Sequence, residues 1–148
     1  MDAADTSDLW TCPRCGKQFV TANTFHSCGA HTVEDFMAGK SDIAWSYWDR
    51  LNELVGACGP YTVVANASRL AFTVRVRFAG ISAVSDRGMS MSFWLKERVH
   101  SPRFRRVDRY TQTDFGYHLR VASLDALDAA RQQRVCRAYG VGWQRDRP

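Results

Sequence analysis

Residues 69–78 of the chain are RLAFTVRVRF, and residues 89–96 are MSMSFWLK. In both segments apolar and polar side chains alternate with a period of two, which is the pattern of a strand buried on one face only. Asp86-Arg87-Gly88 supplies a turn before the second segment, and Phe104–Tyr110 and Tyr117–Val121 have the composition of two further strands. Because no helical segment separates these strands, the sequence predicts an antiparallel sheet of about four strands.

Segments with helical periodicity flank the predicted sheet. Thr32 is a suitable N-cap for a short helix that stops at Gly39, and Ser41 or Asp42 can cap a longer one that ends at Gly59-Pro60. A last helix is expected from Leu124 to Tyr139, capped by Ser123 and closed by Gly140, with Leu127, Val135, Ala138 and Tyr139 on its inner side. The inner stripe of the longer helix is expected to be Ile43, Tyr47, Leu51, Leu54, Val55 and Cys58. The fold class is therefore α+β, with helices packed on a sheet in two layers.

Near the amino terminus the chain has the ligand spacing of a structural zinc site. Cys12 and Cys15 are two residues apart, and Cys28 follows as a third thiolate ligand. The fourth ligand can be His26 or His31, and the spacing alone leaves both alternatives open. Since four protein ligands close the coordination shell, we expect a zinc ion with a structural role.

Length and composition indicate one ordinary core with a small appendage held by metal. The chain has 148 residues, of which 45% are hydrophobic. We expect a flexible lead at residues 1–9, the zinc knuckle at residues 10–31, an α+β domain at residues 32–142 and a flexible tail at residues 143–148. There is no apolar run of membrane length and no export leader, so we expect no membrane contact and a cytoplasmic location.

The remaining two cysteines and the charge distribution bear on the compartment and the partner. Cys58 and Cys136 are isolated in helical patterns, which favours unpaired core thiols in a reducing compartment. Residues 61–123 contain eleven Lys/Arg and four Asp/Glu, which gives a net charge of +7. Residues 1–60 contain four Lys/Arg and eight Asp/Glu, which gives a net charge of −4. An anionic partner would therefore be attracted to the middle of the chain.

The predicted strands place basic side chains on the face opposite the core. Arginine has a planar fork that suits phosphate or carboxylate, and an exposed tryptophan among cations can stack on a base. The alternative is that these side chains form the ordinary solvated face of a two-layer domain. The basic run at residues 101–106, SPRFRR, is either a solvated loop or a clamp beside that face. The candidate ligand-binding residues are Arg69, Arg75, Arg77, Trp94, Lys96, His118 and Arg120.

Several enzyme classes lack their sequence signatures here. The acidic residues of the sheet region are scattered, so the chain has neither the carboxylate pair of glycosidases nor the acidic cluster of two-metal nucleases. There is no glycine-rich phosphate loop, no nucleophile elbow and no zinc deaminase signature. These absences favour a protein that is not an enzyme.

Motifs along nearly the whole chain resemble one family. They are WTCPRCG at residues 10–16, His26-Ser27-Cys28, Thr32–Phe36 with Gly39, Cys58-Gly59-Pro60, Leu70-Ala71-Phe72 and Ala138-Tyr139 with Gly142. Together they resemble the domain of unknown function 5655 family. The resemblance implies an α+β domain with His26 as the fourth metal ligand, and it implies no established activity.

Three function classes follow from the sequence. The first is a non-enzymatic binding module whose basic sheet face binds nucleic acid or another polyanion. The second is a sensor or carrier of a small anion, with Arg69, Trp94, His118 and Arg120 lining its pocket. The third is an enzyme with a site that none of the known signatures describes. No pattern in the sequence predicts an oligomeric state.

Overall fold

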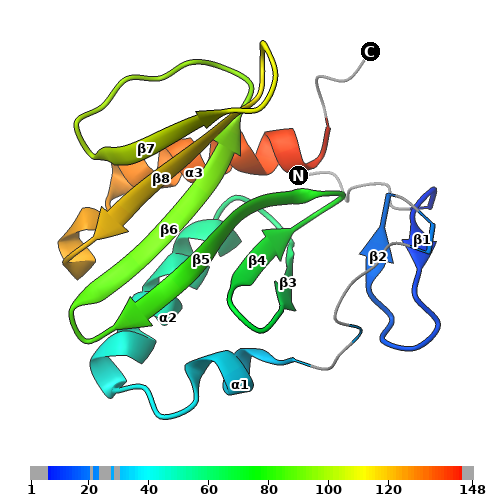
Figure 1. Cartoon of the computed structure of the whole chain (residues 1–148), viewed down its shortest axis with the longest axis horizontal. Helices are drawn as coiled ribbons and strands as arrows, with labels where there is room; N and C mark the ends of the chain where they lie inside the picture. The colour runs from blue at the N-terminus through cyan, green and yellow to red at the C-terminus, as the bar shows by residue number, and fades with distance from the viewer. Residues whose placement is uncertain (1–6, 21, 24–27, 29–30, 145–148) are drawn as a thin grey trace.

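A computed structural model of the chain describes residues 7–20, 22–23, 28 and 31–144, and its architecture is α+β in two layers. One layer is a six-stranded sheet, and the other contains helices α2 (Asp42–Gly56) and α3 (Ala129–Gly142), which both lie behind the sheet in Figure 1. A small hairpin of β1 (Trp10–Thr11) and β2 (Gln18–Phe19) lies at the side of the sheet that ends in β3. No helix of the described residues covers the opposite face of the sheet, which we call the open face.

The six-stranded sheet is antiparallel throughout, with the order β3-β4-β5-β6-β8-β7. Strands β3 to β6 form a meander, but β8 lies between β6 and β7, so the chain passes over one position and then returns. The predicted antiparallel α+β fold is confirmed, and the sheet is larger than the four strands expected. The strands are β3 (Thr62–Ala65), β4 (Leu70–Thr73), β5 (Arg77–Ser85), β6 (Gly88–Leu95), β7 (Phe104–Arg109) and β8 (Phe115–Val121).

The prediction of one continuous strand over residues 69–78 was wrong, because the chain turns back at residues 74–76. Thr73 pairs with Arg77 across this turn. The turn packs on the end of α3, where the Val76 N–H donates to the Gly142 carbonyl at 3.0 Å. A Cβ atom on Gly142 would lie 2.8 Å from the Val74 side chain, so the glycine permits this close approach. These contacts with the helix outweigh the strand preference of the local sequence.

The core lies between the sheet and the two long helices. The alternation predicted for residues 89–96 and 117–121 is confirmed, since every second residue of β6 and β8 is buried against the helices. The helical stripe needs one correction: Ile43 is 55% exposed, whereas Ala44 and Trp48 are buried. The stacked rings of Trp48 and Phe72, with centroids 5.5 Å apart, join α2 to the sheet.

Polar side chains cap the helices as their positions require. Helix α1 (Val33–Met37) begins with a capping box between Thr32 and Asp35, and Ser41 caps α2 through the Ala44 N–H. The last helix was expected from Leu124 to Tyr139, but α3 begins later, at Ala129, and ends later, at Gly142. Ser123 precedes only a 3-10 turn, η1 (Leu124–Ala126), and Asp128 provides the actual cap of α3, which continues past Gly140.

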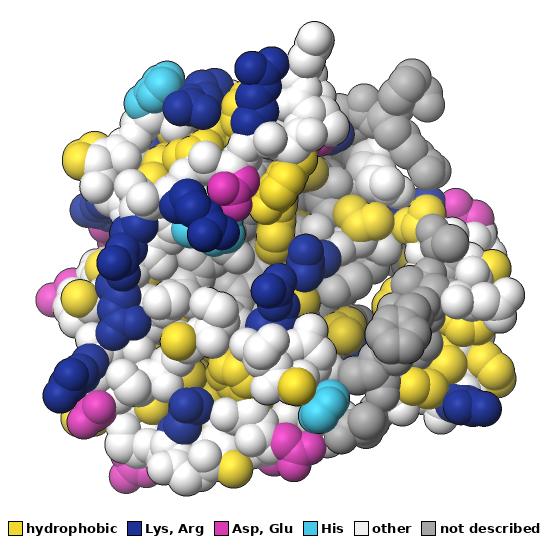
Figure 2. Space-filling model, in the orientation of Figure 1, with side chains coloured by type: hydrophobic (Ala, Val, Ile, Leu, Met, Phe, Trp, Pro, Cys, Tyr) yellow, Lys and Arg dark blue, Asp and Glu magenta, His cyan; other side chains and the backbone are white. Residues whose placement is uncertain are grey.

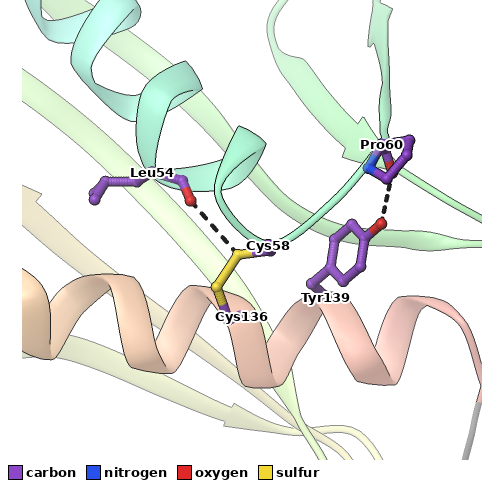
Figure 3. Close-up of a disulfide and its surroundings, with 5 residues drawn as sticks. All are labelled: Leu54, Cys58, Pro60, Cys136 and Tyr139. Atoms are coloured by element: carbon purple, nitrogen blue, oxygen red, sulfur yellow. Dashed lines mark hydrogen bonds between the residues drawn. A yellow bond between two sulfur atoms is a disulfide. The ribbon is translucent and has the colours of Figure 1, made fainter. Parts of the chain in front are cut away.

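Figure 3 shows a disulfide between Cys58, after the end of α2, and Cys136 in α3, with an S–S distance of 2.04 Å. The prediction that these two cysteines are unpaired core thiols was wrong, because the helices bring them together across 78 positions of sequence. The Tyr139 hydroxyl donates to the Pro60 carbonyl at 2.7 Å beside the disulfide. The expectation of a reducing compartment rested partly on unpaired thiols and loses that support.

Residues next to both ends of the described chain meet at Arg75. The Asp8 carboxylate lies 2.6 and 2.8 Å from the two terminal guanidinium nitrogens of Arg75, and Gln144 accepts from its Nε at 3.2 Å. Leu9 is also buried. Residues 8–9 and 144, which the sequence placed in the lead and the tail, are therefore packed on the domain. None of the helices described has the length and apolar character needed to cross a membrane.

Candidate metal centre and anion-binding hollow

The β1–β2 hairpin brings the first two cysteines of the predicted metal site together. The Cys12 N–H donates to the Lys17 carbonyl, and the Gly16 N–H donates to the Cys12 carbonyl, both at 2.8 Å. Gly16 has a φ of +76°, which is a conformation that glycine adopts without a steric penalty. Lys17 also donates to the Val63 carbonyl at 2.9 Å, and this bond ties the hairpin to the edge strand β3.

Three thiols converge at this hairpin, and they could hold a metal ion. The Sγ atoms of Cys12, Cys15 and Cys28 all lie within 4.8 Å of one another, and those of Cys12 and Cys28 are 3.6 Å apart. A tetrahedral ion with metal–sulfur bonds of about 2.3 Å would separate two sulfurs by about 3.8 Å. The separation of Cys12 and Cys28 is close to this value, and the other sulfur pairs lie within 4.8 Å.

The thiols also influence one another's protonation. A hydrogen bond from the Cys15 backbone lowers the pKa of Cys12 to about 6. The hydrogen bond with Cys12 raises the pKa of Cys28 to about 11. Crowded sulfurs that resist simultaneous ionisation are the arrangement in which a cation replaces protons.

The fourth ligand is not decided by the part of the chain that the structure describes. His26 lies outside the described residues. His31 is described, and it is not a member of the three-thiol group. Cys28 has a φ of +53°, an uncommon conformation for a residue with a side chain.

The open face of the sheet contains a hollow with a volume of about 460 Å³. A row of small residues runs across its floor, because Ala71, Gly80 and Ser92 are paired in register on β4, β5 and β6. A Cβ atom on Gly80 would lie only 2.7 Å from the Leu70 carbonyl oxygen, so that position needs glycine. Figure 2 shows this face, with basic side chains gathered around its middle.

Arginines line the hollow from both sides. Arg69 and Arg77 lie on the β4–β5 side, and Arg105 and Arg106 lie on the opposite side, on β7. The pairing of β7 with β8 shifts between Phe104 and Arg106, and this bulge explains how two consecutive arginines reach one face of the sheet. Of the basic run at residues 101–106, only Arg105 and Arg106 line the hollow, whereas Arg103 pairs with Asp128.

Three of these arginines have no acidic partner. Within the described residues, Arg69, Arg77 and Arg105 form no ion pair with a carboxylate. Burial, followed by the positive charge of Arg69, lowers the pKa of Arg77 from its usual value. The Arg77 guanidinium lies 4.6 Å from the centroid of the Trp94 ring, which offsets part of this cost by a cation–π contact.

A carboxylate is present at the β7 side of the hollow. The Oδ2 atom of Asp108 lies 2.9 Å from His118 Nε2 and 3.1 Å from Arg106 Nη2. Burial raises the pKa of Asp108, but the hydrogen bond from His118 and the charge of Arg106 outweigh it, and the pKa lies below its usual value. Ser92 is paired in register with His118 on the neighbouring strand.

Four of the seven candidate ligand-binding residues line the hollow: Arg69, Arg77, Trp94 and His118. Lys96 is 2.5 Å from Asp114 and lines a neighbouring hollow, and Arg120 donates to Ser90 at 3.3 Å without lining the first hollow.

Arg75 does not belong to this face. It lies in the turn between β4 and β5, is only 7% exposed and pairs with Asp8. Arg105 and Arg106 belong to the basic run at residues 101–106, but the sequence did not place them among the ligand-binding candidates, and it did not indicate Asp108 or Tyr110 either. The basic run and the irregular alternation after it were the only indications in the sequence. The bulge in β7 explains why the alternation did not assign these residues to a face.

Comparison of the chain with protein-family models, with curated proteins and with solved structures finds no match.

Proposed function

We propose that this protein is a non-enzymatic binding module whose open sheet face binds nucleic acid or another polyanion through phosphate groups. The observation that carries the proposal is the set of arginines without a counter-charge. Arg69 and Arg77 share one side of a hollow, Arg105 lies on the other, and none has a carboxylate partner among the described residues.

Arg69 and Arg77 line the same hollow, and no carboxylate of the described residues pairs with either of them. Arg69, Arg77 and Arg105 are exposed, so water solvates them, but the charge of Arg69 still disfavours the charged form of Arg77, and a bound anion would offset this repulsion. The guanidinium group offers a planar fork of donors that fits two phosphate oxygens at once. A phosphate in the hollow would supply the opposite charge that Arg69 and Arg77 lack, so the side-chain arrangement supports an anionic ligand.

A small anion is the second candidate, and the dimensions of the hollow favour it. Its volume of about 460 Å³ lies within the range of pockets that take small molecules, which is roughly 300 to 1,000 Å³. A polyanion would extend beyond the hollow along the face, whereas a small anion would be held by Arg69, Arg77, Arg105 and Arg106 alone.

We further propose that Cys12, Cys15 and Cys28 bind a structural zinc ion with His26 as the fourth ligand. The 3.6 Å separation of two sulfurs and the preference of thiolates for zinc support this choice of metal. The ion would stabilise the hairpin that lies against β3, and it would take no part in ligand binding at the open face.

The test is an affinity measurement with the zinc-loaded full chain. Fluorescence anisotropy of a labelled single-stranded oligonucleotide of mixed sequence, at low salt, would be compared between the parent and an Arg69→Gln/Arg77→Gln variant. Arg87→Gln is the matched control, because Arg87 is exposed at the turn between β5 and β6 and does not line the hollow.

We expect the double variant to bind at least about tenfold more weakly, which corresponds to about 1.4 kcal/mol, while the control binds as the parent does. Equal affinity of the folded double variant and the parent would refute the proposal. Saturable stabilisation by pyrophosphate, without binding of the oligonucleotide, would favour the small-anion candidate.

A further inference from the structure

A second hollow, of about 340 Å³, adjoins the first at the edge of the open face, where Val141 of α3 and Gln144 also line it. Arg77 and Trp94 line both hollows, so these two side chains form the wall between them. The second hollow has a different character, because Val76, Leu95 and Val141 contribute apolar surface to it. Two adjoining hollows of unlike chemistry suggest a ligand with two unlike parts.

Apart from Arg77, which both hollows share, the charged side chains of the second hollow form an ion pair. Its lysine, Lys96, lies 2.5 Å from the carboxylate of Asp114, which also lines the hollow. The hydrogen bond from Lys96 lowers the pKa of Asp114, which keeps this carboxylate ionised at neutral pH. An anion therefore gains little there, in contrast to the first hollow with its unpaired Arg69 and Arg77.

Tyr110 supplies an aromatic surface to the second hollow, and it is 55% exposed. The outer edge of its ring lies over Gly116, where an added Cβ atom would come within 2.9 Å of both Cε2 and the hydroxyl oxygen. The Tyr110 N–H donates to the Asp114 carbonyl at 2.9 Å, so the tight turn that follows β7 holds the residue in position. Glycine at position 116 is what lets the ring lie so close to β8.

Trp94 is less suited to stacking than the sequence suggested. The Arg77 guanidinium lies over its ring at 4.6 Å and covers one face. Its indole nitrogen is turned toward Gly116, at 3.2 Å from the position of an added Cβ atom, beside the Tyr110 ring. Trp94 thus acts as the support of Arg77, and Tyr110 is the ring with exposed surface.

We propose that the second hollow binds the base of a nucleotide unit, stacked on Tyr110, while the phosphate of that unit lies in the first hollow against Arg77. This inference rests on the proposed function, since it assigns the phosphate to the arginines. The ligand class is a nucleotide, either free or within a single strand, because a ligand with a planar ring next to a phosphate would use both hollows.

The test separates the base from the phosphate. Binding of oligothymidylate and of an abasic oligonucleotide of equal length would be measured with the zinc-loaded full chain and with Tyr110→Ala and Tyr110→Phe variants. Thymidine monophosphate would serve as the free nucleotide. Circular dichroism would confirm that each variant is folded.

We expect Tyr110→Ala to weaken oligothymidylate binding by about 5- to 150-fold and to leave abasic binding unchanged, since stacking is worth about 1 to 3 kcal/mol per base. Tyr110→Phe should bind as the parent does, because it keeps the ring. Thymidine monophosphate binding that is equally sensitive to Tyr110→Ala would identify the free nucleotide as sufficient, and its absence would identify the single strand.

Two outcomes would overturn the inference in distinguishable ways. Equal affinity of the parent for abasic and thymidine oligonucleotides, with binding still lost in Arg69→Gln/Arg77→Gln, would leave the anion site intact and remove the base site. Absence of binding by either oligonucleotide and by pyrophosphate would reject the proposed function together with the inference.

Discussion

Removing the disulfide between Cys58 and Cys136 should destabilise the protein without affecting the open face. The bond closes a loop with a sequence separation of 78 residues. In the chain-entropy description, a loop of that length restricts the unfolded state by about 4.5 kcal/mol at 25 °C, and typical measured values are about 2 to 4 kcal/mol. A domain of this kind has a free energy of unfolding of only about 5 to 15 kcal/mol, so the disulfide supplies a large share of it.

The assay is urea unfolding followed by far-UV circular dichroism. The parent would be compared with and without a phosphine reductant, and with a Cys58→Ala/Cys136→Ala variant. With a urea dependence of about 2 kcal/mol per molar, a loss of 2 to 4 kcal/mol lowers the midpoint by about 1 to 2 M. Oligonucleotide binding below the transition should be unchanged, because the disulfide joins the helices behind the sheet.

The variant supplies the control, because reductant should not change its midpoint. Coincident unfolding curves of the oxidised and reduced parent would refute the entropy argument. Alkylation and mass measurement that find Cys58 and Cys136 as free thiols in the oxidised parent would refute the bond itself.

The remaining predictions concern the metal centre, a buried hydroxyl and a helix cap. By elemental analysis, His26→Ala should lose zinc and His31→Ala should retain it; the reverse result would reassign the fourth ligand. Tyr117→Phe should lower the free energy of unfolding in urea by about 1 to 3 kcal/mol, because it removes bonds at 2.7 and 2.5 Å to backbone groups of the loop before β7; an unchanged midpoint would contradict this. Asp128→Ala should cost about 1 kcal/mol at neutral pH. The hydrogen bond from the Arg131 backbone lowers the pKa of Asp128. The cap therefore stabilises the parent fully at pH values above the usual aspartate pKa, and this contribution is lost as the pH falls through the lowered pKa. A difference between parent and variant that persists in acid would contradict the assignment.

The sequence predicted those parts of the fold that depend on local pattern. The strict alternation at residues 89–96 is realised in β6, and the capping positions Thr32 and Ser41 are realised in α1 and α2. Alternation failed where a tertiary contact decided the structure. Residues 74–76 contain two valines and no glycine, proline or asparagine, yet they form a turn because they pack on the end of α3.

The candidate sites show the same limit. Trp94 and His118 were found from the period of two, since β6 and β8 pair in regular register, whereas Arg69 and Arg77 line the hollow although a turn separates their strands. Arg105 and Arg106 could not be assigned to one face, because a bulge places consecutive residues on the same side. The pairing of Cys58 with Cys136 depends on how two helices cross, which no spacing in the sequence encodes.

The structure was also needed to decide whether Tyr110 or Trp94 has a ring surface free for stacking. Both are aromatic residues near arginines in the sequence, and only the geometry reveals that Arg77 covers Trp94 while Gly116 leaves room for Tyr110. The glycine at position 116 is visible in the sequence, but its role follows only from the structure, which places the Tyr110 ring against it.

The central claim is that unpaired arginines on the open sheet face bind phosphate groups, and its most direct test is the salt dependence of oligonucleotide binding. For single strands, each phosphate contact contributes about −0.7 to the slope of log K against log salt concentration. Loss of two contacts in Arg69→Gln/Arg77→Gln should therefore flatten the slope by about 1.4, whereas Arg87→Gln should keep the parent slope. Parallel lines for the parent and the double variant would contradict the account.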